Sequence, residues 1–377
     1  MDNYKTQWSL FLIVLVGFFS IETAVANHGP DKFWERMSIF SEIDKTGELG
    51  PFSVNVKSFG SRPNLELTKI SSNDRYDQYF KDEYNIAALV TKSGKIIYER
   101  YNAQKNIDQN SQLFGASFAK TATSSVIGGL LCEGRIKDLD APASDYSEFL
   151  AATEFADITI RNLLQMNSGV SAGRSVDEKR ITRQARGILR FEGKGNVRKA
   201  LKRFSDKETE QGERFEYHAA DTLALAVLAE DITGEILSKT FYDSHFVKFS
   251  PNGHMHWLSD QKGTPAAFAD LVMSARDWSA FGNYLMGHLR AGSCLGKFFQ
   301  NGVDNAVSTP REGVGYGFQS WVYMIENKPT LVMRGHGGQF NVILPEKNTV
   351  VTIISIDENY SFGNLFKRIT ELVERVL

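Results

Sequence analysis

The hydrophobic pattern places strand-like runs at the two ends of the chain and helical runs between them. Residues 86–91 and 95–101, joined at Ser93-Gly94, predict a β-hairpin. Four more β-rich runs predict an antiparallel meander near the C-terminus, at 316–325, 330–334, 340–344 and 350–356. A turn sequence at 326–329 separates the first two runs, and another at 345–348 separates the last two.

Helical periodicity dominates the middle of the chain. Residues 117–132 predict a buried helix that begins near Ser117, and 158–166 and 222–233 predict two more. An amphipathic helix at 362–377 would pack on the sheet. The predicted fold class is therefore α+β: an antiparallel sheet from both chain ends, flanked by helices, with a mainly helical subdomain at about 138–290.

The N-terminal segment has the pattern of a signal peptide. Lys5 precedes an uncharged stretch at 8–21, and Ala24-Val25-Ala26 follows as a cleavage pattern. The alternative, an uncleaved membrane anchor, requires roughly 20 apolar residues, and the stretch at 8–21 is shorter than that. We expect a signal peptide at 1–26, an irregular extension at 27–80 and the main domain at 81–377. The mature protein is then expected in the periplasm or outside the cell, without stable membrane insertion.

The composition and net charge of the chain indicate no particular binding partner. The 377 residues are 42% hydrophobic and 23% charged, with a net charge of −2, so nothing favours nucleic acid binding. Two cysteines leave a single disulfide open, but the apolar run around Cys132 favours a buried thiol. The charge-rich stretch 174–207 is typical of a solvated helical insertion. The sequence leaves the oligomeric state open.

Ser117 and Lys120 are the first candidate catalytic residues. Their spacing places hydroxyl and amine on one helix face, and an adjacent amine can activate a serine. The same spacing recurs at Ser259 and Lys262, but Gly263-Thr264-Pro265 follows and opens no helix. The helical context therefore favours Ser117 as the nucleophile.

Two further motifs supply the rest of a candidate site. Tyr217 precedes an Ala- and Leu-rich helix and is a candidate base, since a nearby cation lowers a phenol pKa. His336-Gly337-Gly338-Gln339 lies between two strand-like runs, where glycines permit close approach of a substrate. We expect the N–H groups of Ser117 and Gln339 to bind an oxyanion, with His336 and Gly338 lining the substrate site.

Together, these three motifs resemble those of the class C β-lactamase and DD-peptidase family, in the same order. The segment 158–169 is similar to the family's Thr-Ile-Arg-x-Leu-Leu-x-Met-x-Ser-Gly, and the resemblance covers about 80–375. It implies a β-lactamase/transpeptidase-like fold and a covalent acyl-enzyme.

Two departures from the family pattern bear on the substrate. Tyr217-His218-Ala219 lacks the usual Asn or Ser two residues after the tyrosine, and His336 replaces the lysine of Lys-Thr-Gly. The pattern is closer to the esterase and 6-aminohexanoate-oligomer hydrolase branch. We expect a small ester or amide that lacks a recognised carboxylate. The alternatives are a DD-peptidase or β-lactamase, and an inactive binding protein of the same fold.

Two competing sites are weaker. Gly169-Val170-Ser171-Ala172-Gly173 matches the nucleophile elbow Gly-x-Ser-x-Gly, but the flanks lack its strand and helix. His254 and His256 with Asp260 could suggest a metal site, yet no further ligand cluster follows, which favours a polar loop. We therefore expect neither a metal nor a cofactor.

Overall fold

The computed structural model describes residues 56–60, 85–170, 196–204 and 207–357, together with Lys367 and Thr370. Several predictions lie outside these residues: the signal peptide at 1–26, most of the extension at 27–80, Ser171, and most of the stretches 174–207 and 362–377. No helix within the described ranges is long and apolar enough to cross a membrane.

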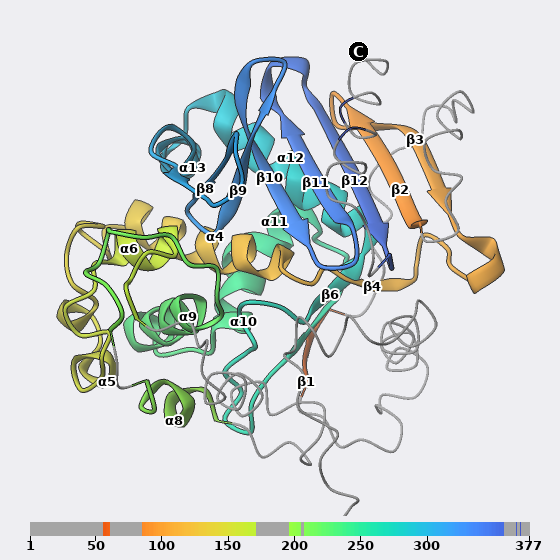
Figure 1. Ribbon diagram of the computed structural model, residues 1–377. Helices are drawn as coiled ribbons and strands as arrows, with labels where there is room; N and C mark the ends of the chain where they lie inside the picture. The colour runs from red at the N-terminus through yellow and green to blue at the C-terminus, as the bar shows by residue number, and fades with distance from the viewer. Residues whose placement is uncertain are drawn as a thin grey trace, which may run out of the picture.

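The main sheet joins a hairpin at residues 85–101 to the strands near the C-terminus, as the pattern predicted. Its eight antiparallel strands have the order β3-β2-β12-β11-β10-β9-β8-β7 (Figure 1). The strands are β2 (Asn85–Lys92), β3 (Lys95–Tyr101), β7 (Val307–Ser308), β8 (Val314–Gly317), β9 (Ser320–Ile325), β10 (Lys328–Gly335), β11 (Gln339–Leu344) and β12 (Thr349–Ser355).

One predicted strand is in fact two. The run at 316–325 is interrupted at Phe318 and Gln319, whose φ angles are 50° and 62°, so the chain reverses between β8 and β9. Neither residue is a glycine or an asparagine, and the sequence therefore carried no turn signal there.

A second sheet has no counterpart in the sequence prediction. Its order is β1-β5-β6-β4, from β1 (Val56–Phe59), β5 (Met255–Leu258), β6 (Leu271–Ser274) and β4 (Gln112–Phe114). The predicted polar loop is wrong at His256, which belongs to β5, where every residue is buried, whereas His254 lies just before the strand. A short strand buried on both faces has no alternation to reveal it.

Helices form two groups around the main sheet. They are α4 (Phe118–Cys132), α5 (Glu148–Ala151), α6 (Ile160–Gln165), α8 (Val197–Leu201), α9 (Ala220–Thr233), α10 (Leu237–Phe241), α11 (Val247–Phe249), α12 (Ala275–Ala291) and α13 (Cys294–Asp304). Short turns of other helix types lie at Ala103–Lys105, Ala143–Asp145, Tyr242–Phe246 and Pro345–Lys347. In Figure 1, α12 lies behind the sheet, α13 lies beside it next to β8, and α5, α6, α8 and α9 gather to one side of it.

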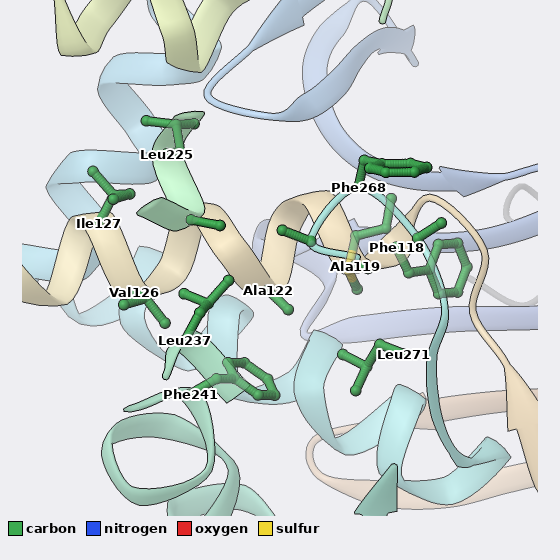
Figure 2. Close-up of a cluster of buried hydrophobic side chains, with 14 of the residues drawn as sticks. Phe118, Ala119, Ala122, Val126, Ile127, Leu225, Leu237, Phe241, Phe268 and Leu271 are labelled. Atoms are coloured by element: carbon green, nitrogen blue, oxygen red, sulfur yellow. The ribbon is translucent and has the colours of Figure 1, made fainter. Parts of the chain in front are cut away.

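Helix α4 runs through the centre of the larger hydrophobic core. Figure 2 shows Ala122, Val126 and Ile127 of α4 among Leu225 of α9 and Phe241 of α10. Apolar residues on nearly every side of α4 are buried, so the helix is enclosed by its neighbours and held in one position.

Cys132 and Cys294 form a disulfide, which corrects the expectation of a buried thiol. The bridge joins the last residue of α4 to the first residue of α13, across a sequence separation of 162. The apolar surroundings of Cys132 indicated burial, but they carried no information about a partner on a distant helix that packs against α4.

The disulfide is expected to contribute to global stability. Replacing both cysteines with serine should lower the free energy of unfolding by about 2–4 kcal/mol, because the unfolded chain loses a long cross-link. Urea denaturation of the double variant and of wild type with and without reductant measures this. Reduced wild type should behave like the variant, and a change below about 0.5 kcal/mol in both would contradict the prediction.

A buried carboxyl on α9 makes stability depend on pH. Burial raises the pKa of Glu230 to about 7, although Oε2 accepts a hydrogen bond from Thr264 Oγ1 at 2.8 Å and Oε1 accepts one from the Leu237 N–H. In the unfolded chain this carboxyl loses its proton near its ordinary value of 4.5. Between these values the folded protein holds a proton that the unfolded chain has lost, so stability falls as pH rises towards 7.

Glu230→Gln should remove this dependence. At about pH 8 the variant should exceed wild type in stability by up to about 3 kcal/mol, and at about pH 5 the two should be close. Urea denaturation across this range provides the measurement, with the exposed Glu235→Gln as the matched control. An equal difference at both pH values would show that Glu230 is not the titrating group.

Candidate active site

Ser117 lies at the N-terminus of α4, where its hydroxyl is turned towards Lys120. The preceding Ala116 has a φ of 46°, a left-handed conformation that is costly for alanine. Ser117 occupies the cap position, yet its side chain makes no capping bond. Instead, Lys120 Nζ donates to Ser117 Oγ at 3.3 Å. The structure thus brings the two residues together as their spacing predicted.

Lys120 is held in place by contacts from two other segments. Its side chain is 4% exposed, and Nζ donates to the carbonyl oxygen of Phe268 at 2.9 Å. The same nitrogen lies 4.6 Å from the centre of the Tyr217 ring. The amine therefore sits between the serine hydroxyl and the tyrosine ring, where it can influence the protons of both.

The segment at 158–169 holds the loop that carries Tyr217. Helix α6 ends at Met166 in a left-handed conformation, and the Met166 carbonyl accepts a hydrogen bond from the Glu216 N–H at 2.8 Å. The Asn167 carbonyl accepts a second one from the Gly212 N–H at 2.7 Å. The end of α6 thus anchors the loop that leads to Tyr217.

Gln319, in the turn between β8 and β9, connects three helices of the site. Its N–H donates to the Leu164 carbonyl of α6 at 2.7 Å, and its Oε1 accepts from Thr222 of α9 at 2.7 Å. Its own carbonyl accepts from Thr121 of α4 at 3.2 Å. These bonds fix the helix of Ser117 relative to the helices on either side of Tyr217.

The end of β10 passes directly against the residues before Ser117. A Cβ atom added at Gly335 would come within 2.7 Å of the Gly115 carbonyl oxygen and 3.1 Å of Ala116 Cβ. His336, Gly337 and Gly338 form the turn to β11, and the two glycines have φ angles of 87° and 82°. Gly335 allows the close approach, and the next two glycines allow the turn.

A pocket of about 460 Å³ opens at this junction. The residues that line it are Ser117, Arg214, Phe215, Glu216, Tyr217, Thr309, Pro310, Arg311, Trp321, Arg334, Gly335 and His336. Of the predicted site residues, it brings together Ser117, Tyr217 and His336, with Lys120 bonded to Ser117. Gly338 and Gln339 do not line it, and the buried Gln339 amide donates to the His336 carbonyl at 3.0 Å.

Sequence reasoning missed several residues of this pocket. Trp321 packs 5.2 Å from the Tyr217 ring, and Phe215 lies 6.2 Å from Trp321. Arg334 stands two residues before His336, and strand alternation could have placed both on one face. The Phe268 carbonyl, which binds Lys120, had no signal in the sequence.

A second tyrosine beside Tyr217 stays protonated. The Tyr316 ring lies 5.8 Å from that of Tyr217, and burial, followed by the charges of Tyr217 and Asp221, raises the pKa of Tyr316 well above its ordinary value. Asp221 is itself buried, with Oδ2 at 3.4 Å from His218 Nε2. Of these two phenols, Tyr217 is therefore the one suited to exchange a proton with substrate.

The described residues contain no group of three or more His, Cys, Asp and Glu side chains that could hold a metal ion. His256 Nδ1 lies 2.8 Å from Ser58 Oγ across the pair β1 and β5.

Comparison with known proteins identifies the family. No curated protein matches the chain. Among solved structures, a protein from Bacillus anthracis assigned as a 6-aminohexanoate-dimer hydrolase has a TM-score of 0.75 at 19% identity, covering 92% of this chain and 96% of its own. A penicillin-binding protein from Bacillus halodurans has a TM-score of 0.62 at 17% identity, covering 80% and 99%.

A family VIII carboxylesterase has a TM-score of 0.60 at 16% identity, covering 81% and 96%. At these identities the likeness shows the fold, which is the predicted β-lactamase/transpeptidase-like fold. The beta-lactamase family model matches residues 75–363, which is well over half of the sequence. The chain belongs to the beta-lactamase family.

Proposed function

We propose that this protein is a serine hydrolase that cleaves a small ester or amide through an acyl-enzyme on Ser117. The observation that carries the proposal is the 3.3 Å contact between Lys120 Nζ and Ser117 Oγ at the pocket. Solved structures of the same fold that are named as an amidohydrolase and a carboxylesterase support this substrate class.

In the proposed reaction, Ser117 Oγ attacks the substrate carbonyl carbon and its proton passes to the Lys120–Tyr217 pair. The tetrahedral intermediate collapses, and the alcohol or amine leaves with that proton. Water then attacks the acyl carbon with Tyr217 as base, which releases the acid and restores the Ser117 hydroxyl. The N-terminus of α4 contributes a partial positive charge beside the developing oxyanion.

The oxyanion site needs one change from the sequence expectation. The Ser117 N–H stays in its proposed role. We place the second donor at the backbone of His336 instead of Gln339, because Gly335 and His336 line the pocket with Ser117 and Gln339 does not. Gln339 pairs with Gly335 across β10 and β11, one step behind the pocket.

We also propose that the protein acts outside the cytoplasm. The signal-peptide pattern at 1–26 and the Cys132–Cys294 disulfide support this, because disulfides persist in oxidising compartments.

Covalent labelling tests the nucleophile. Intact-protein mass spectrometry after incubation with a fluorophosphonate should show one adduct in wild type and none in Ser117→Ala. Ser259→Ala, at the other serine with lysine three residues later, is the matched control and should label normally. Lys120→Met should slow labelling by at least about 100-fold, because the hydroxyl loses its activating group.

Separate incubation of the same variants with a penicillin and with a short-chain aryl ester distinguishes the alternatives. Turnover of a short-chain aryl ester with no penicilloyl adduct supports the esterase or amidase function. Stable penicilloylation would indicate a DD-peptidase-like protein instead. Absence of any adduct would favour the inactive binding protein.

Gly335→Ala tests the proposed oxyanion backbone. The added methyl group would press on Gly115 and Ala116, shifting the His336 N–H relative to Ser117, and should lower kcat/KM for 4-nitrophenyl butyrate by about 10- to 100-fold. Gly287→Ala on α12, where no atom lies within 4 Å of the added Cβ, is the control and should keep full activity. Unchanged activity in a folded Gly335→Ala variant would argue against this placement.

A further inference from the structure

We propose that Glu230 and Thr264 are positioning residues for Lys120. The charge on Glu230 sets how firmly the 259–270 loop holds this amine beside Ser117. The inference rests on the proposed function and adds a means of control to the same site. Neither Glu230 nor Thr264 lines the pocket, so both act through the loop and not through contact with a substrate.

The 259–270 loop connects β5 to β6 and contacts α4 through two consecutive carbonyl groups. The Phe268 carbonyl accepts a hydrogen bond from Lys120 Nζ at 2.9 Å. The neighbouring Ala267 carbonyl accepts one from Thr123 Oγ1, also at 2.9 Å. Because both acceptors belong to the backbone, the course of the loop fixes where the amine of Lys120 is held.

Thr264 joins the near end of this loop to two carboxyl groups. Its N–H donates to Asp260 Oδ1 at 3.1 Å, and its Oγ1 donates to Glu230 Oε2 at 2.8 Å. Asp260 accepts two further backbone hydrogen bonds, each at 2.7 Å. Residues 263–270 are all buried, so the segment from Thr264 to Phe268 has little room to absorb a movement of either carboxyl group.

Charged groups on three other segments surround the Glu230 carboxyl group. Arg198 Nη2 of α8 lies 3.6 Å from Glu230 Oε2, but it makes a shorter contact of 2.6 Å with Asp231. Lys239 of α10 has a side chain that is 45% exposed and forms its ion pair with a different carboxylate. Burial raises the pKa of Glu230 to about 7, and the charge of Asp260 adds to this effect. Ionisation of Glu230 therefore adds a negative charge beside a second buried carboxyl group.

The two carboxyl groups repel each other across Thr264 once both are charged. Below about pH 7 the protonated Glu230 still accepts the Thr264 hydroxyl, and no repulsion from Asp260 opposes this contact. Above this pH the repulsion loosens the loop that carries the Phe268 carbonyl. The reactivity of Ser117 should therefore rise less with pH than the deprotonation of its activating groups alone would give.

The rate of fluorophosphonate labelling at Ser117, followed from about pH 5.5 to about pH 8.5, tests this coupling. Glu230→Gln has no charge at any pH. It should label like wild type at about pH 5.5 but about 3- to 10-fold faster at about pH 8. The exposed Glu235→Gln is the matched control and should label like wild type throughout.

Thr264→Val tests the route from the carboxyl group to the loop. The variant keeps the shape of the side chain but loses the hydroxyl, and it should label about tenfold more slowly than wild type at about pH 6. In this background Glu230→Gln should change labelling by less than about twofold, because the link is already cut. Thr233→Val removes a hydroxyl that donates within α9 to the Ala229 carbonyl, and this control should label normally.

The amine of Lys120 gives a second readout that does not need catalysis. In protein whose lysines carry carbon-13 at the ε position, the NMR signal absent from Lys120→Met belongs to Lys120. In wild type this signal should show a step near pH 7, and the step should vanish in Glu230→Gln. A purely structural role for Glu230 would leave the signal without such a step.

The two proposals fail in different ways. Equal labelling of Glu230→Gln and wild type at both pH values, or an undiminished difference in the Thr264→Val background, would overturn the positioning role while Ser117 labelling still supported the hydrolase. A wild-type Lys120 signal without the step near pH 7 would overturn the positioning role as well. Absence of labelling in wild type would overturn the hydrolase, and the Lys120 signal would then decide the coupling by itself.

Discussion

The burial of a polar helix is the constraint on which the rest of this structure depends. Helix α4 lies inside the core, yet it carries Lys120 and a series of threonines and serines. A buried polar group without a hydrogen bond costs about 1–3 kcal/mol, so a partner from a neighbouring segment stabilises such a side chain. Lys120 bonds the Phe268 carbonyl, Thr123 the Ala267 carbonyl and Thr121 the Gln319 carbonyl.

These bonds serve stability and the site together. The polar side chains of α4 bind the 266–268 loop and the β8–β9 turn. The 266–268 loop in turn holds Lys120, and the β8–β9 turn holds α6, whose end binds the loop that carries Tyr217. The left-handed backbone at Ala116 and Gln319 is kept by this surrounding structure and places Ser117 and α6 correctly. The hydrogen bonds that pair the buried polar groups of the core therefore also set the geometry of the site.

The sequence predicted those features that depend on local pattern. The hairpin β2–β3, helix α4, helix α9 and the C-terminal strands follow from periodicity over many residues, and the contact of Ser117 with Lys120 follows from one helical turn. The β1-β5-β6-β4 sheet was missed, because its strands are short and at least β5 and β6 are buried throughout.

Features that depend on distant contacts could not be read from the sequence. The reversal at Phe318 and Gln319 has no turn residues, and the disulfide joins helices whose packing only the fold determines. The expected role of Gln339 depended on where the turn after β10 begins, which a Gly-Gly pair does not fix. The signal peptide at 1–26 stays a prediction, since those residues are outside the described part of the chain.

The end of β10 has a consequence for substitutions in the pocket. Gly335 meets the residues before Ser117 and lines the pocket together with Arg334 and His336, so the end of this strand supplies the pocket with both backbone and side chains. A substitution at position 334 or 336 changes a side chain that lines the pocket and leaves Ser117 and Lys120 in place. The side chains at the end of β10 can therefore change without disturbing the helix that carries Ser117.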